Sequence, residues 1–166
     1  MVGGGPMASV HLMCGFIGFG KTTTARKIAA QHSAVLLTHD DFMVRLYGRE
    51  KVPEKIFRDR WHKTDDLLWD IAEKIVCAGG SVVLDYGFWS KGSRKAAVER
   101  AKRFCDSVTF HQVECDMAVA RKRLIERSKT DPSSLDISAE TFDDLADRYE
   151  PISQDEGFDV IYYRNI

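Results

Sequence analysis

Residues 15–22 constrain this chain more than any other segment, because they combine glycines with a lysine and a threonine at fixed spacing. The sequence there is Gly-Phe-Ile-Gly-Phe-Gly-Lys-Thr, which fits the pattern G-x-x-x-x-G-K-[ST] at every fixed position. Glycines let successive backbone N–H groups curl around a phosphate without a clash from a Cβ atom. The segment, which we call the glycine loop, therefore predicts a site for the phosphates of a nucleotide.

The two residues that close the glycine loop indicate how a nucleotide would be held. Lys21 can reach the β- and γ-phosphates, and the Thr22 hydroxyl can ligate Mg²⁺. We therefore expect ATP and Mg²⁺ as cofactors, with the choice between ATP and GTP left open. The residues expected to contact the nucleotide are Gly15, Phe16, Ile17, Gly18, Phe19, Gly20, Lys21, Thr22 and Thr23. Because Phe16 and Phe19 are bulkier than the residues usual at their positions, this loop is expected to pack differently.

The flanking residues place the glycine loop between a strand and a helix. Residues 9–14 read as a short, mostly apolar strand, and residues 22–30 as a helix. In this order the N-terminus of the helix points its free N–H groups at the phosphates. A plain glycine-rich turn is the alternative, but Lys and Thr in register with the glycines argue against it.

Strands and helices alternate along the remaining sequence. We expect strands at 34–38, 81–85, 107–113 and 158–163, and helices at 54–77, 91–104, 116–127 and from 138 onward. Residues 39–52 read as a polar stretch without regular structure. Strands that alternate with helices predict a three-layer α/β/α fold around a five-stranded parallel sheet, whose ligands bind beyond the carboxyl ends of the strands.

Length and composition narrow the class of protein. The 166 residues fit one domain over 7–166, after a probable linker at 1–6 with Met7 as the natural start. The net charge of −1 argues against nonspecific binding of nucleic acid, and no run of eighteen apolar residues predicts a membrane span. The four cysteines are widely spaced without a C-x-x-C pair, which favours reduced thiols in the cytoplasm.

Aspartates follow two of the predicted strands at the edge that would face the glycine loop. Asp85 ends an apolar strand, the usual place for a carboxylate that helps to hold Mg²⁺, although a helix-capping role is the alternative. Asp40 and Asp41 follow the strand at 34–38. A kinase needs a carboxylate that orients the acceptor hydroxyl and accepts its proton, and we favour Asp40, with Asp41 as a cap of the next turn. From spacing alone, either Asp40 or Asp85 could be the base.

Basic residues suggest a lid and a contact to the acceptor. Arg123 and Arg127 are spaced i,i+4 on one helix, within a lid expected at about 116–137, where they could clamp the γ-phosphate. A solvated basic face is the alternative. Arg94 lies one turn into another basic helix and could reach the substrate. Phe88 and Trp89 could form the wall of an acceptor pocket, with ordinary packing as the alternative.

These segments resemble the small P-loop kinases of the AAA-type ATP-binding (zeta-toxin-like) family. They also resemble polynucleotide 5′-kinase and chloramphenicol phosphotransferase domains. The resemblance covers nearly the whole chain from Met7. It rests on residues 14–23, 38–41, 82–89 and 154–159 and on the Arg123/Arg127 pair. It implies a nucleotide-kinase-like fold with a helical lid and the sheet order 2-3-1-4-5. It also implies that Asp40 acts as base, that Asp85 positions substrate or metal, and that the lid arginines bind the donor phosphates.

The sequence departs from polynucleotide kinases at two places near the expected acceptor. His39 precedes Asp40, where those enzymes often carry arginine, and the stretch 86–89 is unlike theirs. Both points weaken a nucleic-acid acceptor. We therefore expect an ATP- and Mg²⁺-dependent kinase that acts on a hydroxyl of a small molecule. The alternatives are a polynucleotide or nucleoside 5′-hydroxyl kinase, and a switch protein that binds and hydrolyses ATP without such an acceptor.

Overall fold

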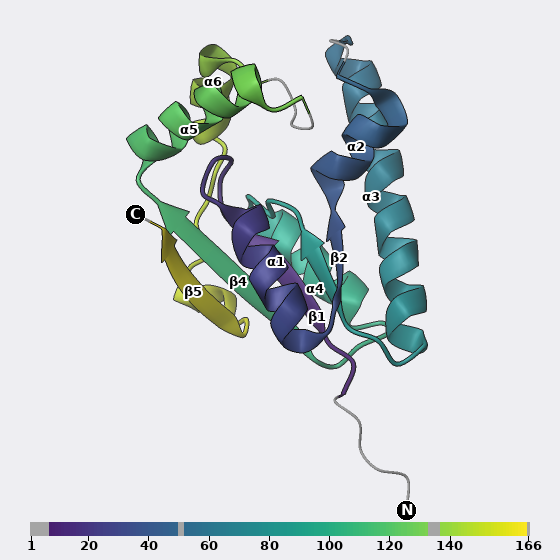
Figure 1. The fold of residues 1–166 in the computed structure, drawn as a ribbon. Coiled ribbons are helices and arrows are strands. Elements are labelled where there is room, and N and C mark those ends of the chain that lie inside the picture. Colours follow the sequence, from purple (N-terminus) through teal and green to yellow (C-terminus); the bar gives the residue numbers. More distant parts are fainter. Residues whose placement is uncertain (1–6, 50–51, 133–136, 166) are drawn as a thin grey trace, which may run out of the picture.

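A five-stranded sheet forms the centre of the computed structural model, which describes residues 7–49, 52–132 and 137–165 (Figure 1). All pairings between neighbouring strands are parallel, and the strand order β2-β3-β1-β4-β5 confirms the expected order. The strands are β1 (Val10–Cys14), β2 (Val35–Thr38), β3 (Val82–Asp85), β4 (Val108–Cys115) and β5 (Val160–Asn165). The expected linker at 1–6 lies outside the described residues, as does part of the expected lid, at 133–136.

Helices cover both faces of the sheet and give the three expected layers. The elements are α1 (Lys21–His32), α2 (His39–Tyr47), α3 (Glu54–Cys77), α4 (Lys91–Ala101), α5 (Met117–Thr130), α6 (Ala139–Ala146) and the 3₁₀ helix η1 (Gln154–Glu156). Successive strand residues point to opposite faces. Leu12 of β1 therefore packs in a core with α3 and α4, whereas Met13 packs in a second core with α1, α5 and α6.

Helix α2 is absent from the sequence-based expectation, which left residues 39–52 as a polar stretch. The helix follows β2 directly, with Thr38 in an extended conformation at its N-cap. The helix buries only His39 and Met43, and Met43 accepts a hydrogen bond from the Thr64 hydroxyl of α3 at 3.3 Å. Packing against α3 therefore stabilises a short helix whose own sequence signal is weak.

A row of hydrogen-bonded polar side chains lies on the α1 face of the sheet. Nδ1 of His11 lies 2.9 Å from Nε2 of His111, and Nδ1 of His111 lies 2.9 Å from the hydroxyl of Tyr163. Both histidines are buried, and burial lowers the pKa of each imidazole to about 4. The row therefore joins β1, β4 and β5 through neutral rings.

None of the helices in the described part of the chain is long and apolar enough to cross a membrane.

Candidate active site

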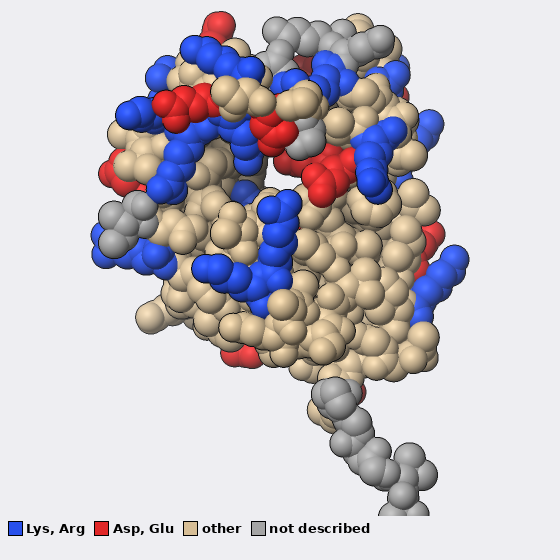
Figure 2. Space-filling view, viewed as in Figure 1, with Lys and Arg blue, Asp and Glu red and all other residues tan. Residues whose placement is uncertain are grey.

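A pocket of about 800 Å³ opens at the carboxyl ends of the strands. Figure 1 shows two arms, one carrying α5 and α6 and the other α2 and α3, and the space-filling view in Figure 2 shows the hollow between them. One wall, here called the loop side, consists of Ile17, Gly18, Gly20, Lys21, Thr22, Thr23, Arg127, Ile137, Leu145 and Arg148. The opposite wall, here called the aromatic side, consists of His39, Phe57, Trp61, His62, Asp65, Trp69, Tyr86, Phe88, Ser93, Ala96, Ala97 and Arg100. Asp40 and Asp85 also line the pocket.

The glycine loop connects β1 to α1, in the arrangement expected from the sequence. Gly18 has a φ of +78°, and a Cβ atom there would lie 2.6 Å from the carbonyl oxygen of Ala120 in α5. Phe16 and Phe19 turn their rings into the core below the loop, with ring centres 5.9 Å apart. These two residues can therefore offer a ligand only their backbone, and their bulk anchors the loop.

Lys21 is the first residue of α1 and lies in the pocket. Its Nζ donates a hydrogen bond to the carbonyl oxygen of Phe16 at 2.8 Å, inside the glycine loop. Burial lowers the pKa of Lys21, and the nearby carboxylates of Asp85 and Asp40 partly oppose that change. The ammonium group is thus held close to two acids, Asp85 at the end of β3 and Asp40 in the first turn of α2.

Asp85, at the end of β3, is linked by hydrogen bonds to the start of α1 and to the end of β2. Its Oδ2 accepts one bond from the Thr22 hydroxyl at 2.7 Å and another from the Thr38 hydroxyl at 3.2 Å. Burial raises the pKa of Asp85, whereas Lys21 and the two hydroxyls act in the opposite direction. A threonine hydroxyl beside a carboxylate is an oxygen donor set that suits Mg²⁺, so Thr22 and Asp85 fit the expected metal site.

Asp40 lies in the first turn of α2, and its solvent-exposed side chain lines the pocket. Desolvation of the carboxyl group within the pocket raises the pKa of Asp40, while Lys21 and Arg127 lower it. A raised pKa makes a carboxylate a better proton acceptor. Its neighbour Asp41 is exposed and does not line the pocket.

Of the two expected lid arginines, one lines the pocket and the other does not. Arg127 lines the pocket, and its charge acts on both Lys21 and Asp40. Arg123 is outside the pocket lining, and its Nη1 lies 3.6 Å from the sulfur of Cys115. Arg148, which follows α6, also lines the pocket. Sequence reasoning did not single out Arg148.

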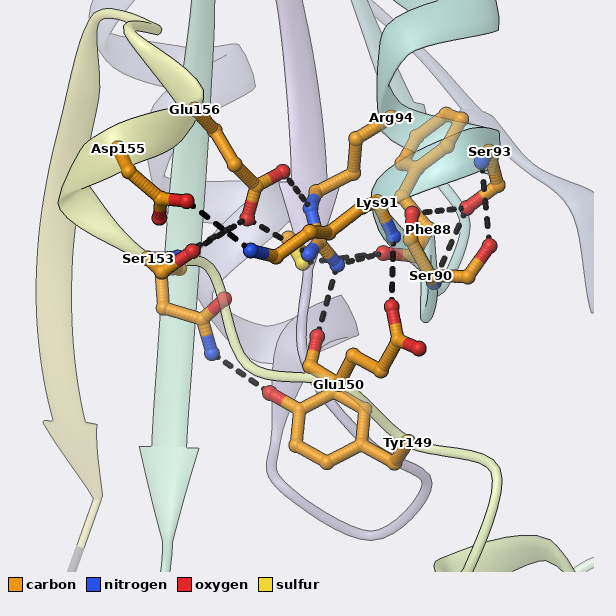
Figure 3. A network of polar contacts seen from close by, with 12 residues as sticks. Phe88, Ser90, Lys91, Ser93, Arg94, Tyr149, Glu150, Ser153, Asp155 and Glu156 are labelled. Carbon is orange, nitrogen blue, oxygen red and sulfur yellow. Dashed lines mark hydrogen bonds and ion pairs between the residues drawn. The ribbon is translucent and has the colours of Figure 1, made fainter.

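Arg94 does not reach the pocket, which corrects the expectation that it contacts substrate. Figure 3 shows its guanidinium turned toward Glu156 of η1, with bonds of 2.7 and 2.8 Å to the two carboxylate oxygens. Arg94 is fully buried, and the Glu156 side chain is 6% exposed. A buried cation needs a partner of opposite charge, and here a segment more than sixty residues away supplies it.

The Arg94–Glu156 pair holds part of the pocket wall. Arg94 also donates bonds to the carbonyl oxygens of Phe88 at 2.9 Å and Glu150 at 2.8 Å (Figure 3). Phe88 has a φ of +46°, a conformation that costs free energy for a residue with a side chain. The bonds to its carbonyl oxygen offset that cost. The pair therefore positions the Phe88 ring on the aromatic side.

The aromatic side agrees in part with the sequence-based expectation. Phe88 and Trp89 line the pocket as expected, and Trp61 and His62 of α3 line it as well. Asp65, Trp69 and Arg100 also line it, and sequence reasoning did not single them out. Asp65 and Trp69 lie four and eight residues after Trp61 and therefore share its helical face, which is the signal that could have identified them.

A family model described as an AAA domain matches residues 10–152. No curated protein matches the chain at a significant level. Among solved structures, a candidate kinase from Chloroflexus aurantiacus J-10-fl is similar at a TM-score of 0.75 and 15% identity, over 96% of this chain and 89% of that one. Kti12 from Chaetomium thermophilum, in complex with ADP-AlF3, is similar at a TM-score of 0.66 and 19% identity, over 94% of this chain and 88% of that one. A sugar kinase from Janibacter sp. HTCC2649 is similar at a TM-score of 0.64 and 20% identity, over 96% of this chain and 86% of that one.

Proposed function

Because the chain belongs to the AAA domain family, whose model matches residues 10–152, we propose that it is an ATP- and Mg²⁺-dependent kinase. The acceptor is a hydroxyl group of a small molecule. One observation carries the proposal: Lys21, Asp40, Asp85 and Arg127, from four different elements, converge in a single pocket. The structural neighbours support it, because one holds ADP-AlF3 and another is a sugar kinase.

The loop side binds the donor nucleotide. Backbone N–H groups of residues 15–23 and the N-terminus of α1 surround the phosphates. Lys21, whose Nζ donates to the Phe16 carbonyl oxygen in the structure, would bind the β- and γ-phosphates, and Thr22 with Asp85 would hold Mg²⁺. When bound, Mg²⁺ neutralises negative charge on the phosphates.

Asp40 orients the acceptor and takes its proton. As the acceptor oxygen forms a bond to the γ-phosphorus, the bond from that phosphorus to the bridging oxygen breaks and ADP leaves. The proton of the hydroxyl passes to the Asp40 carboxylate, whose raised pKa suits this role. Asp85 is already engaged by two hydroxyl donors, so Asp40 is the better candidate for the base.

The lid supplies positive charge as the phosphoryl group moves. Arg127 faces Lys21 and Asp40 across the pocket and stabilises charge on the γ-phosphoryl oxygens in the transition state. Arg148 is placed to assist from the segment after α6. Arg123 lies outside the pocket lining and has no role in this proposal. The four cysteines are free thiols, which fits a reducing compartment, and we expect the reaction to take place in the cytoplasm.

The experiment measures ADP formation by the purified protein with ATP, Mg²⁺ and a panel of metabolites, nucleosides, antibiotics and 5′-hydroxyl oligonucleotides. We expect one class of small molecule to stimulate turnover. Asp40→Asn should then lower kcat by about 100-fold or more, while ATP binding persists. Asp41→Asn is the matched control, because it removes an adjacent carboxylate outside the pocket lining.

Each contrary result has a distinct meaning. Unchanged turnover of Asp40→Asn contradicts the assignment of the base. Preferred transfer to oligonucleotides favours the end-kinase alternative. Tight ATP binding without stimulation by any acceptor favours the switch protein.

A further inference from the structure

The aromatic side of the pocket carries information about the acceptor beyond the fact that it has a hydroxyl group. The rings of Trp61, His39, Tyr86 and Phe88 form a continuous row. Ring centres are 4.6 Å apart between Trp61 and His39, 5.1 Å between His39 and Tyr86, and 5.2 Å between Tyr86 and Phe88. All four residues line the pocket; Trp61 and Phe88 are partly exposed there, whereas His39 and Tyr86 are buried, with 3% and 6% exposure. We call this row the aromatic floor.

The aromatic floor passes next to the proposed base. His39, the second ring of the row, immediately precedes Asp40 in α2, so a molecule lying on the floor lies close to the carboxylate that accepts the proton. Planar rings bind such a surface through stacked or edge-to-face contacts. The floor is also held in place, since Arg94 fixes the Phe88 backbone.

Charge on the aromatic side disfavours an anion. Of the lysines and arginines that line the described pocket, Arg100 is the one that α3 and α4 contribute. Its guanidinium nitrogens already face Asp66 at 3.1 Å, Asp70 at 3.8 Å and Asp65 at 3.9 Å. A negatively charged group would have to compete with three carboxylates for one cation. A neutral or cationic group meets no such competition.

Asp65 gives this wall a polar contact as well. Its side chain is 20% exposed and lines the pocket. Burial first, and then the nearby Asp65 carboxylate, raise the pKa of Tyr86, so Asp65 lies beside the phenol end of the floor. The Tyr86 hydroxyl itself is buried without a hydrogen-bond partner of acceptable geometry in the described structure. Buried polar groups of this kind usually have partners.

We propose that the acceptor is an alcohol that carries an aromatic ring and no negative charge, with the ring on the aromatic floor and an amino or hydroxyl group donating to Asp65. This inference rests on the proposed function for the meaning of "acceptor". It concerns binding, however, and binding can be measured without phosphoryl transfer.

Three probes share a phenyl ring and a secondary hydroxyl and differ in charge: 2-amino-1-phenylethanol, 1-phenylethane-1,2-diol and mandelate. Gluconate and glycerol represent acceptors without a ring. Binding of each to the protein with a non-hydrolysable ATP analogue is measured by thermal shift and by tryptophan fluorescence. We expect the amino alcohol and the diol to bind at least about tenfold more tightly than mandelate, and gluconate and glycerol to bind more weakly still.

Variants test the two contacts separately. Trp61→Ala should weaken the binding of the amino alcohol and of the diol by about tenfold, whereas Trp61→Phe should retain most of the affinity for both compounds. Asp65→Asn should lower the affinity of the amino alcohol toward that of the diol and leave the diol nearly unchanged. Leu67→Ala is the control, because Leu67 is an exposed residue of α3 outside the pocket lining.

Tighter binding of mandelate or gluconate overturns the proposal, and so does the failure of all three ring compounds to bind. Binding of the ring compounds without any phosphoryl transfer contradicts the kinase function but leaves this inference intact. Transfer of phosphate to an anionic or ring-free acceptor would support the kinase function but contradict this inference about the acceptor.

Discussion

The two walls of the pocket are built in different ways. The loop side comes mainly from one short segment whose backbone N–H groups are proposed to bind the donor phosphates, and Arg127 of α5 and Arg148 after α6 complete it. The aromatic side comes from side chains on α2, α3 and α4 and on the turn after β3, and a buried ion pair to a distant segment holds part of it. The first wall is suited to a constant ligand, whereas the second can change its specificity through single side chains.

This contrast also separates what backbone and side chain contribute. Bulky residues of the glycine loop anchor it from below and leave its backbone for the ligand. On the opposite wall, the backbone of Phe88 is held in an unfavourable conformation so that its ring can face the pocket. The predictions below act on one wall at a time, in order of decreasing effect.

Acid should produce the largest change, because three buried histidines must become charged. Burial lowers the pKa of His11, His39 and His111 from 6.5 to about 4. The unfolded chain therefore binds protons first, and the stability that the neutral rings confer is lost as the pH falls from about 6.5 toward 4. Each histidine contributes about 3 kcal/mol, and less where His11 and His111 interact.

Urea denaturation between pH 7 and 4.5 measures this loss. Asp40 and Asp85 act in the opposite direction, since their raised pKa values let the folded protein take up protons earlier. His39→Gln removes the contribution of the aromatic side and should flatten the pH dependence, as should His11→Gln on the α1 face. An unchanged slope in both variants would contradict the assignment to these rings.

Glu156→Gln should weaken the aromatic side through its support. The variant leaves Arg94 buried without a counter-charge, and we expect a loss of about 3 kcal/mol in the free energy of unfolding. Asp155→Asn is the control, because its pair with Lys91 is exposed and should contribute nothing measurable. Denaturation in urea at pH 7 compares the two variants. Equal stability of both would mean that the buried pair does not support the wall.

Arg127→Ala tests the loop side from the lid. We expect kcat to fall by about 100-fold with little change in ATP affinity, because the interaction strengthens in the transition state. Arg123→Ala removes an equal charge from the same helix but outside the pocket lining, and its kcat should stay within about threefold. Steady-state kinetics with the acceptor that stimulates turnover in the panel experiment measure both effects. Similar losses in both variants would indicate a general effect of lid charge.

Gly18→Ala should have the smallest effect, confined to the donor nucleotide. The added Cβ would lie 2.6 Å from the Ala120 carbonyl oxygen, and the alanine would have to keep the positive φ of Gly18. We therefore expect ATP affinity to fall by about tenfold. Gly48→Ala shares the positive φ but meets no atom within 4 Å. It should lower stability by about 1 kcal/mol without changing ATP affinity. Isothermal titration and urea denaturation separate the two effects, and a loss of affinity in Gly48→Ala would contradict this explanation.

The same division explains how far the sequence could be interpreted. The glycine loop, the five strands and Asp85 follow from local patterns, because their residues lie close together in the chain. Strand order came from resemblance, since periodicity does not define which strands pair. Helix α2 was missed because its stability comes from contacts with α3 rather than from its own sequence.

The site residues that sequence reasoning misplaced depend on partners far away in the chain. Arg94 looked like a free cation because nothing near it indicates that Glu156 folds back to meet it. Arg123 and Arg127 share a helical face by spacing, yet the position of α5 over the glycine loop brings only Arg127 to the pocket. Which of these side chains reaches the pocket therefore depends on how distant segments pack together, and spacing within one segment does not reveal that.

One contact of the glycine loop has a consequence for the order in which the protein is made. The side-chain nitrogen of Asn165, at the end of β5, donates to the carbonyl oxygen of Phe19 at 2.7 Å, across 146 positions of sequence. On the ribosome, the glycine loop emerges long before β5. A nascent chain therefore carries the complete nucleotide motif without the contact that holds it in place. Nucleotide binding during translation should consequently begin late, and its onset would mark the moment at which the sheet has closed.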